Sequence, residues 1–512
     1  MAVNTAPEER RMASEEIAPV LVARTLGSFD LIVIFVAIVL FINNSAGVQF
    51  AGPAMFPYWI VAFATFLITG AFVTAQLGRM FPEEGSIYVW THKALGPFWG
   101  FLAGFLAWWP GPIVMVTAGI LVATFLQQIA TLSGNSILTK NWEVGLVVLA
   151  VLWFSAALSL LRMRLTQNYV NVQFFFYAAA IFLIGLAGVV WLAKGNPAAN
   201  SFAAANWKPL LGNKLIFGIP ANLTFFSFAI LALLGIETPL NMGVETTGGE
   251  RTIRRYLIWG SVIVMVAYLW TTWGNMVAVP VGEVNGTTGG AQAVGAAMGK
   301  GFGILVAAIL AWVFLTACVV YNYAFARLLF VSGLEQRLPH QIGQVNKNKV
   351  PANAVILQTV IATVIAIVIF FFIGRGGGDP NKPFYALYAG LTIVWCISTA
   401  ILFLDIFFAK RANPQKFEEA RRTSVGVLYL CGAVGSIVNV AAVFLIFTGT
   451  WYPPGYKTLA EWNKWMIGIT LLSAVVGIAI YLISQRTRRG TPAQALEEGP
   501  VAPAPAGGGG GG

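Results

Sequence analysis

Apolar stretches long enough to cross a lipid bilayer recur along almost the whole of this chain. Hydrophobic residues make up 58% of its 512 positions and charged residues only 10%, more apolar surface than a water-soluble domain can bury. A bilayer core of about 30 Å needs roughly 20 helical residues. The sequence therefore predicts an all-α integral membrane protein with 12 transmembrane spans, near 28–50, 54–79, 96–130, 142–161, 167–193, 217–246, 255–280, 301–332, 352–374, 383–409, 425–448 and 464–485.

Two of these spans carry polar and helix-breaking residues near their centres. In span 1, the polar residues 43–45 precede Gly47, and in span 6, Gly235, Glu237 and Pro239 interrupt the apolar run. Hydrocarbon cannot satisfy the backbone groups that such a break leaves open, so it is tolerated only against protein, water or a ligand. Two breaks five spans apart are typical of carriers built from inverted repeats. We therefore predict a 5+5 inverted repeat in which spans 1 and 6 are discontinuous.

Basic residues indicate how the chain is oriented in the membrane. Of the 31 lysines and arginines, 22 fall in the termini and in the loops on their side, and 9 fall on the other side. The excess of positive charge marks the cytoplasmic side, so both termini are expected in the cytoplasm. The predicted organisation is a cytoplasmic segment at 1–27, a ten-helix core at 28–409, spans 11 and 12 at 410–485 and a disordered tail at 486–512. We expect spans 11 and 12 to lie at the periphery of the protein or to form a homodimer interface.

Several classes of function fit the sequence poorly. The basic residues flank helices instead of forming one stripe, which argues against nucleic acid as a partner. The three cysteines lie apart in apolar spans, and His92 and His340 have no third ligand candidate nearby, so we expect neither a metal nor another cofactor. Motifs of the HExxH or GxSxG type are absent from the sequence, which argues against a membrane-embedded enzyme.

A broken helix offers free N–H groups where its second half begins and free carbonyls where its first half ends. The amides suit a carboxylate, and the carbonyls suit an ammonium group, so the two breaks together could hold a zwitterion. The alternative is two kinked helices that merely pack on their neighbours. The backbone contacts are expected from Ile42, Ser45, Ala46, Gly47, Leu234, Gly235 and Ile236.

Glu237 is the only acid well inside span 6. A carboxylate at that depth is costly unless it is paired, hydrated or protonated. It is either a gating or proton-linked acid beside the site, or a carboxyl group that holds the break open through hydrogen bonds to unwound backbone. Glu245 is expected nearer the cytoplasm, facing water or Arg254. In span 3, Gly100 and Gly104 form a small-xxx-small pair that permits close helix packing.

Four segments resemble the amino acid–polyamine–organocation superfamily of transporters. SAGVQF in span 1 lies where that family has a glycine-serine-glycine turn, and FAILALLGIE in span 6 is similar to its F-x-G-x-E. FPEEGSIYVWTHKALGPFWGFLAGFLAWW resembles its P-x-x-GG-x-Y signature, and ARLLFVSGLEQRLPHQIGQVNKNKVP resembles its S-R-x-x-x…V-N-K-x-x-x-P signature. The residue pattern EG…W…LGP…WGF within the third segment is also similar to that of the glutamate/GABA exchanger subgroup.

The resemblance implies a LeuT-like fold, an α-amino acid or related amine as substrate, and alternating access. Span 5 contains no lysine, whereas some proton-coupled relatives use one there. Exchange, facilitated diffusion or a proton path through Glu237 therefore stay open. When the sequence is aligned with the motifs of that family, the resemblance implies side-chain contacts to the substrate from Leu106, Ala107, Pro110, Gly111, Leu231, Tyr321 and Asn322.

The sequence thus predicts a secondary transporter, either an antiporter or a symporter, that moves an amino acid across the cytoplasmic membrane of a prokaryote. Its partners would be the small substrate and the lipid bilayer. A polyamine or monoamine permease is the main alternative, and a non-transporting amino acid sensor on the same fold is another. Which amino acid or amine is recognised stays open, although a pocket without a basic residue disfavours an acidic substrate held by an ion pair.

Overall fold

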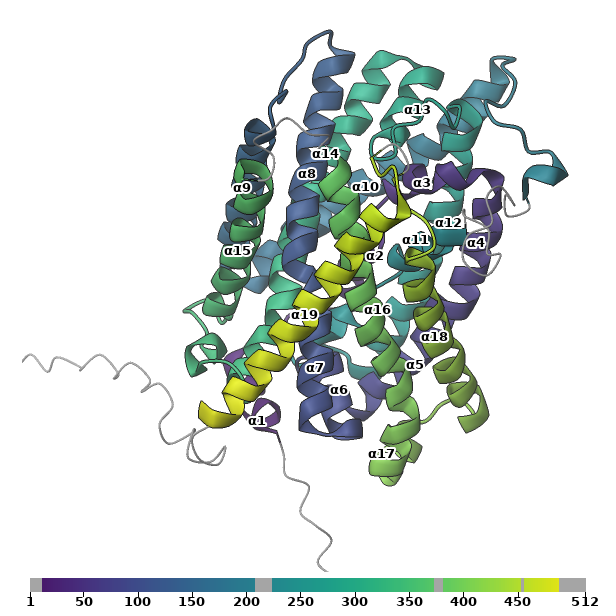
Figure 1. Ribbon diagram of the computed structural model, residues 1–512. Coiled ribbons are helices and arrows are strands. Elements are labelled where there is room, and N and C mark those ends of the chain that lie inside the picture. Colours follow the sequence, from purple (N-terminus) through teal and green to yellow (C-terminus); the bar gives the residue numbers. More distant parts are fainter. Residues whose placement is uncertain (1–11, 208–222, 373–380, 453–454, 488–512) are drawn as a thin grey trace, which may run out of the picture.

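The structure is a computed structural model and describes residues 12–207, 223–372, 381–452 and 455–487. It is a bundle of helices that run mostly along one direction (Figure 1). The described helices of the first part are α1 (Ala13–Leu21), α2 (Ser28–Val39), α3 (Asn44–Gly47), η1 (Val48–Ala54), α4 (Met55–Ala62), η2 (Phe63–Ile68), α5 (Thr69–Met80), α6 (Ser86–Leu95), α7 (Pro97–Trp108), α8 (Pro110–Leu132), α9 (Asn141–Ser159) and α10 (Met163–Ala193). Those of the second part are η3 (Ala204–Trp207), α11 (Thr224–Leu231), η6 (Thr238–Met242), α12 (Gly249–Ala278), α13 (Gly289–Met298), α14 (Lys300–Leu334), η7 (His340–Gly343), α15 (Ala352–Ile367), η8 (Val368–Phe372), α16 (Asn381–Ala412), α17 (Pro414–Ala420), α18 (Val425–Ile446) and α19 (Leu459–Thr487).

Ten helices in the described ranges are long and apolar enough to cross a membrane. The first of them runs from Ser28 to Met80 and contains both of the first two predicted spans. Predicted span 6 is not among the ten, because it is broken and its start at 217–222 lies outside the described residues. Residues 1–11 and most of the predicted tail (488–512) also lie outside the described residues.

The two ends of the bundle differ in the short helices that they carry. The short helices α1, α6 and α17 lie at one end, which we call the α1 end, and α13 lies at the other, which we call the α13 end (Figure 1). Helix α1 is fastened to the end of α14, where the backbone N–H and the hydroxyl of Ser14 both donate to the Glu335 carboxylate at 2.8 Å. The start of span 1 is therefore anchored at the α1 end.

The interruption of span 1 falls slightly earlier than its polar residues suggest. Helix α2 ends at Val39 and α3 begins at Asn44, so residues 40–43 are the non-helical part. Buried backbone groups there that lack a helical partner bond to tyrosines from two other helices. The Tyr177 hydroxyl from α10 donates to the Leu40 carbonyl and accepts from the Ile42 amide at 3.1 Å. Side chains of the protein therefore satisfy many of the backbone hydrogen-bonding groups at this break, which is necessary where water is excluded.

Tyr268 on α12 joins the two breaks through one hydroxyl group. Its oxygen accepts from the Phe41 amide at 3.0 Å and lies 3.0 Å from the Val39 carbonyl and 3.2 Å from the Ala232 carbonyl of span 6. A phenol carries a single proton, so it donates to one of these carbonyls at a time. Trp59 stacks on the tyrosine ring with centroids 4.4 Å apart, which fixes the position of the hydroxyl between the breaks.

Glycines allow α6 and α7 to pack closely, as the small-xxx-small pair predicted. Gly96 turns the chain with a φ of 94°, and Pro97 starts α7, where its missing N–H is not needed. A Cβ on Gly100 would come within 2.7 Å of the His92 Cα, and one on Gly104 within 2.6 Å of the Tyr88 ring. Neither position has room for a larger side chain without a shift of α6.

We expect Tyr268→Phe to destabilise the folded protein by about 1–3 kcal/mol, because buried backbone groups of both breaks lose their partner. Thermal unfolding of the detergent-purified protein measures the effect. Tyr429→Phe on α18 is the matched control, since this ring packs beside Phe407 with centroids 4.9 Å apart and should lose little. Equal stability of the two variants would contradict the role of the hydroxyl.

Gly100→Ala should cost about 1–3 kcal/mol, because the added methyl group is forced against the backbone of α6. The control is Gly468→Ala in the middle of α19, where a Cβ meets nothing within 4 Å and alanine favours the helix. The same unfolding measurement should show a lower midpoint for the first variant and an unchanged or higher one for the second. The opposite order would mean that α6 and α7 do not pack as described.

Candidate functional site

The break in span 6 is built around Gly235. Its φ of 102° belongs to the left-handed region that favours glycine. A Cβ at this position would come within 2.7 Å of Ile38 Cγ2 on α2 and 3.1 Å of the Trp395 ring on α16. The two broken spans therefore touch each other at this point, with α16 closing the third side.

The backbone of span 6 leaves donors open at this contact. The Leu234 amide donates to Leu231 and the Thr238 amide to Gly235, both at 3.1 Å. Within the described ranges, the amides of Gly235 and Ile236 donate to no acceptor. Two adjacent free N–H groups ahead of η6 are suited to an anionic group such as a carboxylate.

Span 1 differs from the expectation in this respect. The Ser45 amide donates to the Ile42 carbonyl at 3.1 Å, and the Ala46 and Gly47 amides donate to the Asn43 carbonyl at 3.0 and 3.1 Å. The Ile42 carbonyl also accepts from the Ser45 hydroxyl at 2.7 Å. The prediction that these amides and this carbonyl are free is wrong, because the turn at 40–43 folds its own carbonyls back over the start of α3.

Glu237 lies directly after the open amides and is 2% exposed. Its Oε1 accepts from the Trp395 indole N–H at 3.4 Å, and its Oε2 has no hydrogen-bond partner among the described residues. A carboxyl oxygen buried without a donor is poised to take a proton or a donor from a ligand. These surroundings favour the gating or proton-linked interpretation of Glu237, since the hydrogen bond that its carboxyl group accepts comes from a side chain and not from unwound backbone.

Tyr321 connects α14 to the end of α2. Its hydroxyl donates to the Ile38 carbonyl at 2.9 Å. Its ring stacks on Phe325 at 4.8 Å and meets the Trp395 ring edge-on at 6.4 Å. The side chain thus lies against both the span 1 break and the aromatic group beside Glu237.

Asn322 follows Tyr321 but points away from the breaks. Its amide nitrogen donates to Ser155 on α9 at 3.2 Å and to Thr359 on α15 at 2.9 Å. Neighbouring residues on an α-helix are turned by about 100°, and here Tyr321 points to α2 whereas Asn322 points to α9 and α15. The expected substrate contact of Asn322 is corrected to a packing role between α14, α9 and α15.

The remaining predicted contacts are all buried. Gly111 lies where α8 meets α14, since a Cβ there would come within 3.0 Å of the Phe325 side chain. Leu231 ends α11 and is 6% exposed. Leu106 and Ala107 near the end of α7 and Pro110 at the start of α8 are buried as well.

Sequence reasoning missed the polar side chains that hold span 1 in place. Asn275 on α12 donates to the Ser45 hydroxyl at 3.1 Å, and Tyr388 on α16 donates to the Asn44 side chain at 3.1 Å. The available signal was the presence of asparagine and tyrosine inside otherwise apolar spans, because such groups need partners in a membrane. That signal identifies polar side chains without indicating which break they serve.

A group of buried charges lies at the α1 end. Glu245 is fully buried and pairs with Arg327 of α14 at 2.8 Å, so the expectation that it faces water or Arg254 is wrong. Glu84, in the loop before α6, lies 3.9 Å from the same guanidinium. Burial, and next the nearby Glu245 carboxylate, raise the pKa of Glu84 well above its usual value.

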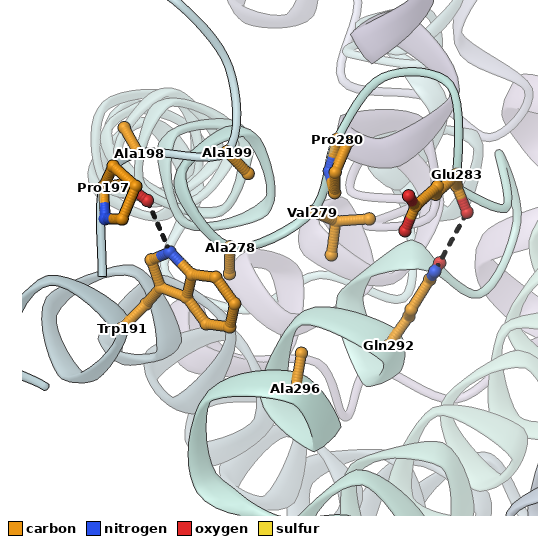
Figure 2. A pocket seen from close by; sticks show the side chains of 10 residues that line it. All are labelled: Trp191, Pro197, Ala198, Ala199, Ala278, Val279, Pro280, Glu283, Gln292 and Ala296. Atoms are coloured by element: carbon orange, nitrogen blue, oxygen red, sulfur yellow. Dashed lines mark hydrogen bonds between the residues drawn. The ribbon is translucent and has the colours of Figure 1, made fainter. Parts of the chain in front are cut away.

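A separate cavity of about 410 Å³ lies beside α13, which contributes Gln292 and Ala296 to its wall (Figure 2). In its wall, the Trp191 indole donates to the Pro197 carbonyl at 2.8 Å and the Gln292 amide to the Glu283 carbonyl at 2.9 Å. None of the predicted site residues lines this cavity, so it is distinct from the contact between the two breaks. Its lining residues are Trp191, Pro197, Ala198, Ala199, Ala278, Val279, Pro280, Glu283, Gln292 and Ala296.

Comparisons with known proteins cover most of the chain. The chain is 23% identical over 497 residues to the inner membrane transporter YjeM of Salmonella typhimurium. This alignment covers 88% of this chain and 94% of YjeM. It is 22% identical over 434 residues to the probable agmatine/putrescine antiporter AguD of Lactococcus lactis subsp. lactis, covering 82% and 87%. It is 24% identical over 425 residues to the branched-chain amino acid permease BcaP of Lactococcus lactis subsp. cremoris, covering 79% and 86%.

These relatives agree on transport but differ in the substrates that their names give. The sequence profile described as amino acid permease matches residues 26–472, which include every long helix except the end of α19. The chain therefore belongs to the amino acid permease family, whose members are membrane transporters and not enzymes.

Proposed function

We propose that this protein is a secondary transporter that moves an amino acid across the cytoplasmic membrane of a prokaryotic cell by alternating access. The observation that carries the proposal is the direct contact between two broken helices, with free amides at Gly235 and Ile236. Backbone donors left open at membrane depth need a ligand or water. A substrate carboxylate on these two amides supplies that ligand.

The site has a candidate closing element on each side. Toward the α1 end, Tyr321 bridges α14 and α2 through the Ile38 carbonyl. Toward the α13 end, the Phe228 ring of α11 lies 3.0 Å from where a Cβ of Gly47 would stand, and packs on Trp451 at 4.7 Å. A ligand shifts the balance between open states only through contacts that differ between them, and Tyr321 and Leu231 are our candidates for such contacts.

The proposal includes the topology expected from the sequence. The twelve spans form two inverted halves of five helices, with the last two outside the core, and both termini face the cytoplasm. The chemical asymmetry of the loops supports this orientation, because 22 of 31 basic residues fall on one side. In this arrangement the α1 end is the cytoplasmic end.

An amine carrier is the second candidate. The observation that favours it is the unpartnered Oε2 of Glu237. This carboxyl group accepts from Trp395, whose ring contacts the rings of Tyr321 and Phe325. A carboxylate beside aromatic faces suits an ammonium or guanidinium group. Relatives of both kinds occur, since AguD is named for agmatine and putrescine and BcaP for branched-chain amino acids.

Transport by reconstituted vesicles separates these candidates. We expect vesicles loaded with a mixture of amino acids to take up one labelled amino acid, and excess decarboxylated amine to compete weakly because it lacks the group that binds the amides. Strong competition by the amine would favour the second candidate. Folded protein that transports none of the twenty amino acids and no amine would contradict both.

Gly235→Ala should lower transport at least about tenfold, the effect of only 1.4 kcal/mol of lost binding. The added Cβ meets Ile38 in a backbone conformation that alanine rarely adopts. Gly134→Ala is the matched control, because Gly134 has a φ of 83° but nothing within 4 Å of its Cβ. Both variants carry the backbone strain, so a loss confined to Gly235→Ala reports on the contact between the breaks. Equal transport by the two would show that this contact is not part of the site.

A further inference from the structure

The charges at the α1 end do not balance. Arg327, Glu84 and Glu245 are each 0% exposed, and one guanidinium faces two carboxyl groups. If both carboxyls were ionised, the buried group would carry a net negative charge, which is strongly unfavourable in a low-dielectric surrounding.

The two carboxyl groups are unequally held. The Glu245 Oε1 accepts from the Arg327 Nε at 2.8 Å and lies 2.8 Å from its Nη2. Glu84 lies 3.9 Å from Nε and accepts one backbone N–H, from Val244, at 3.1 Å. Glu245 is therefore the direct salt-bridge partner of the arginine, and Glu84 is the carboxyl group that the arginine stabilises less.

One oxygen of each carboxyl has no hydrogen-bond donor. These oxygens are Glu84 Oε1 and Glu245 Oε2, both buried. Both carboxyl groups reach the same guanidinium, at 3.9 and 2.8 Å, and after burial the Glu245 charge is the next cause of the raised pKa of Glu84. A single proton between the carboxyls would satisfy both orphaned oxygens and remove the excess negative charge.

We propose that Glu84 and Glu245 form a proton-binding site that holds one proton while the α1 end is closed. Around this site, Arg327 is the cation, and Tyr323 of α14 interacts electrostatically with Arg327, Glu245 and Asp30 of α2. The proton is carried on Glu84 and directed to Glu245, and Arg327 balances the charge that remains.

The site fastens together the segments that close this end. The backbone amides of Thr25 and Leu26 donate to the Glu245 carbonyl at 2.9 and 3.0 Å, which ties the start of span 1 to the loop after η6. On the other side, the Gly85 amide donates to the Asn241 carbonyl at 2.9 Å. When the proton is lost, two neighbouring carboxylates repel each other in the segments that these hydrogen bonds join. Release of the proton therefore weakens these bonds and is linked to opening of the α1 end. This link rests on the proposed function, whereas the proton-binding site does not.

Infrared spectroscopy tests the site without substrate or transport. At pH 8.5, the detergent-purified protein should show a carbonyl band from protonated carboxyl groups, and Glu84→Gln should remove one carboxyl from it. Glu245→Gln should also remove one carboxyl from the band. Without the Glu245 charge, Arg327 pairs with Glu84 alone, and Glu84 loses its proton. A band in Glu245→Gln as strong as in the unchanged protein would mean that no proton is shared, and a band unchanged in Glu84→Gln would overturn the site.

Glu83 supplies the matched control for this experiment. It is the neighbouring acid in the same loop, and burial raises its pKa to about 7. At pH 8.5 it is mostly ionised, so Glu83→Gln should leave the band as it is. If the band fell in Glu83→Gln and not in Glu84→Gln, the proton would belong to Glu83 and the proposal would fail.

Hydrogen exchange tests the link to opening. The closed end holds its proton below the raised pKa of Glu84 and loses it as the pH rises through that value. The protection of the Thr25 and Leu26 amides should then fall about tenfold per pH unit. In Glu84→Gln, which stays neutral, the protection should not change with pH, and in Glu83→Gln it should behave as in the unchanged protein. Protection that is independent of pH in the unchanged protein would separate the proton site from opening and leave the transport proposal standing.

Discussion

A broken helix inside a membrane must find partners for its backbone within the protein, and this requirement organises the centre of the structure. The hydroxyl of Tyr268 lies within hydrogen-bond distance of the Phe41 amide and of the Val39 and Ala232 carbonyls. One side chain from α12 thereby serves both breaks. Because an unpaired group in hydrocarbon costs several kcal/mol, the two breaks are held at a fixed separation by the same atom.

The two breaks are satisfied to different degrees, and this difference has consequences for binding. In span 1, carbonyls of the turn and the tyrosine hydroxyls occupy most of the groups, including the amides at residues 45–47. In span 6, the amides of Gly235 and Ile236 and one oxygen of Glu237 have no partner in the described part of the chain. Span 1 is therefore largely a structural break, and span 6 carries the groups that are free for chemistry.

The sequence predicted the features that depend on local pattern. Apolar length located the long helices, and Gly235 with Pro239 located the break in span 6. The glycine pair in span 3 indicated where α6 and α7 approach each other. The sequence could not predict which side chains on different helices form hydrogen bonds with each other. The helical register places Asn322 beside Tyr321, but only the positions of α9 and α15 show that its amide is already used.

Glu245 illustrates the same limit for charges. Its place after an apolar span suggested contact with water, since most acids at helix ends are exposed. Its burial is possible because α14 carries Arg327 more than eighty positions further along the chain, fully inside the bundle. A separation of this size leaves no periodic trace in the sequence, so the ion pair can be found only once the helices are placed.

The two ends of the helix bundle are held together by different kinds of interaction. At the α13 end, the rings of Tyr388 and Trp451 pack against Phe228 of α11, and such contacts depend little on pH or salt. At the α1 end, the closure includes ionisable groups shielded from water, whose balance changes when a proton arrives or leaves. A transporter built in this way has a pH-sensitive set of contacts at the α1 end and a pH-insensitive one at the α13 end.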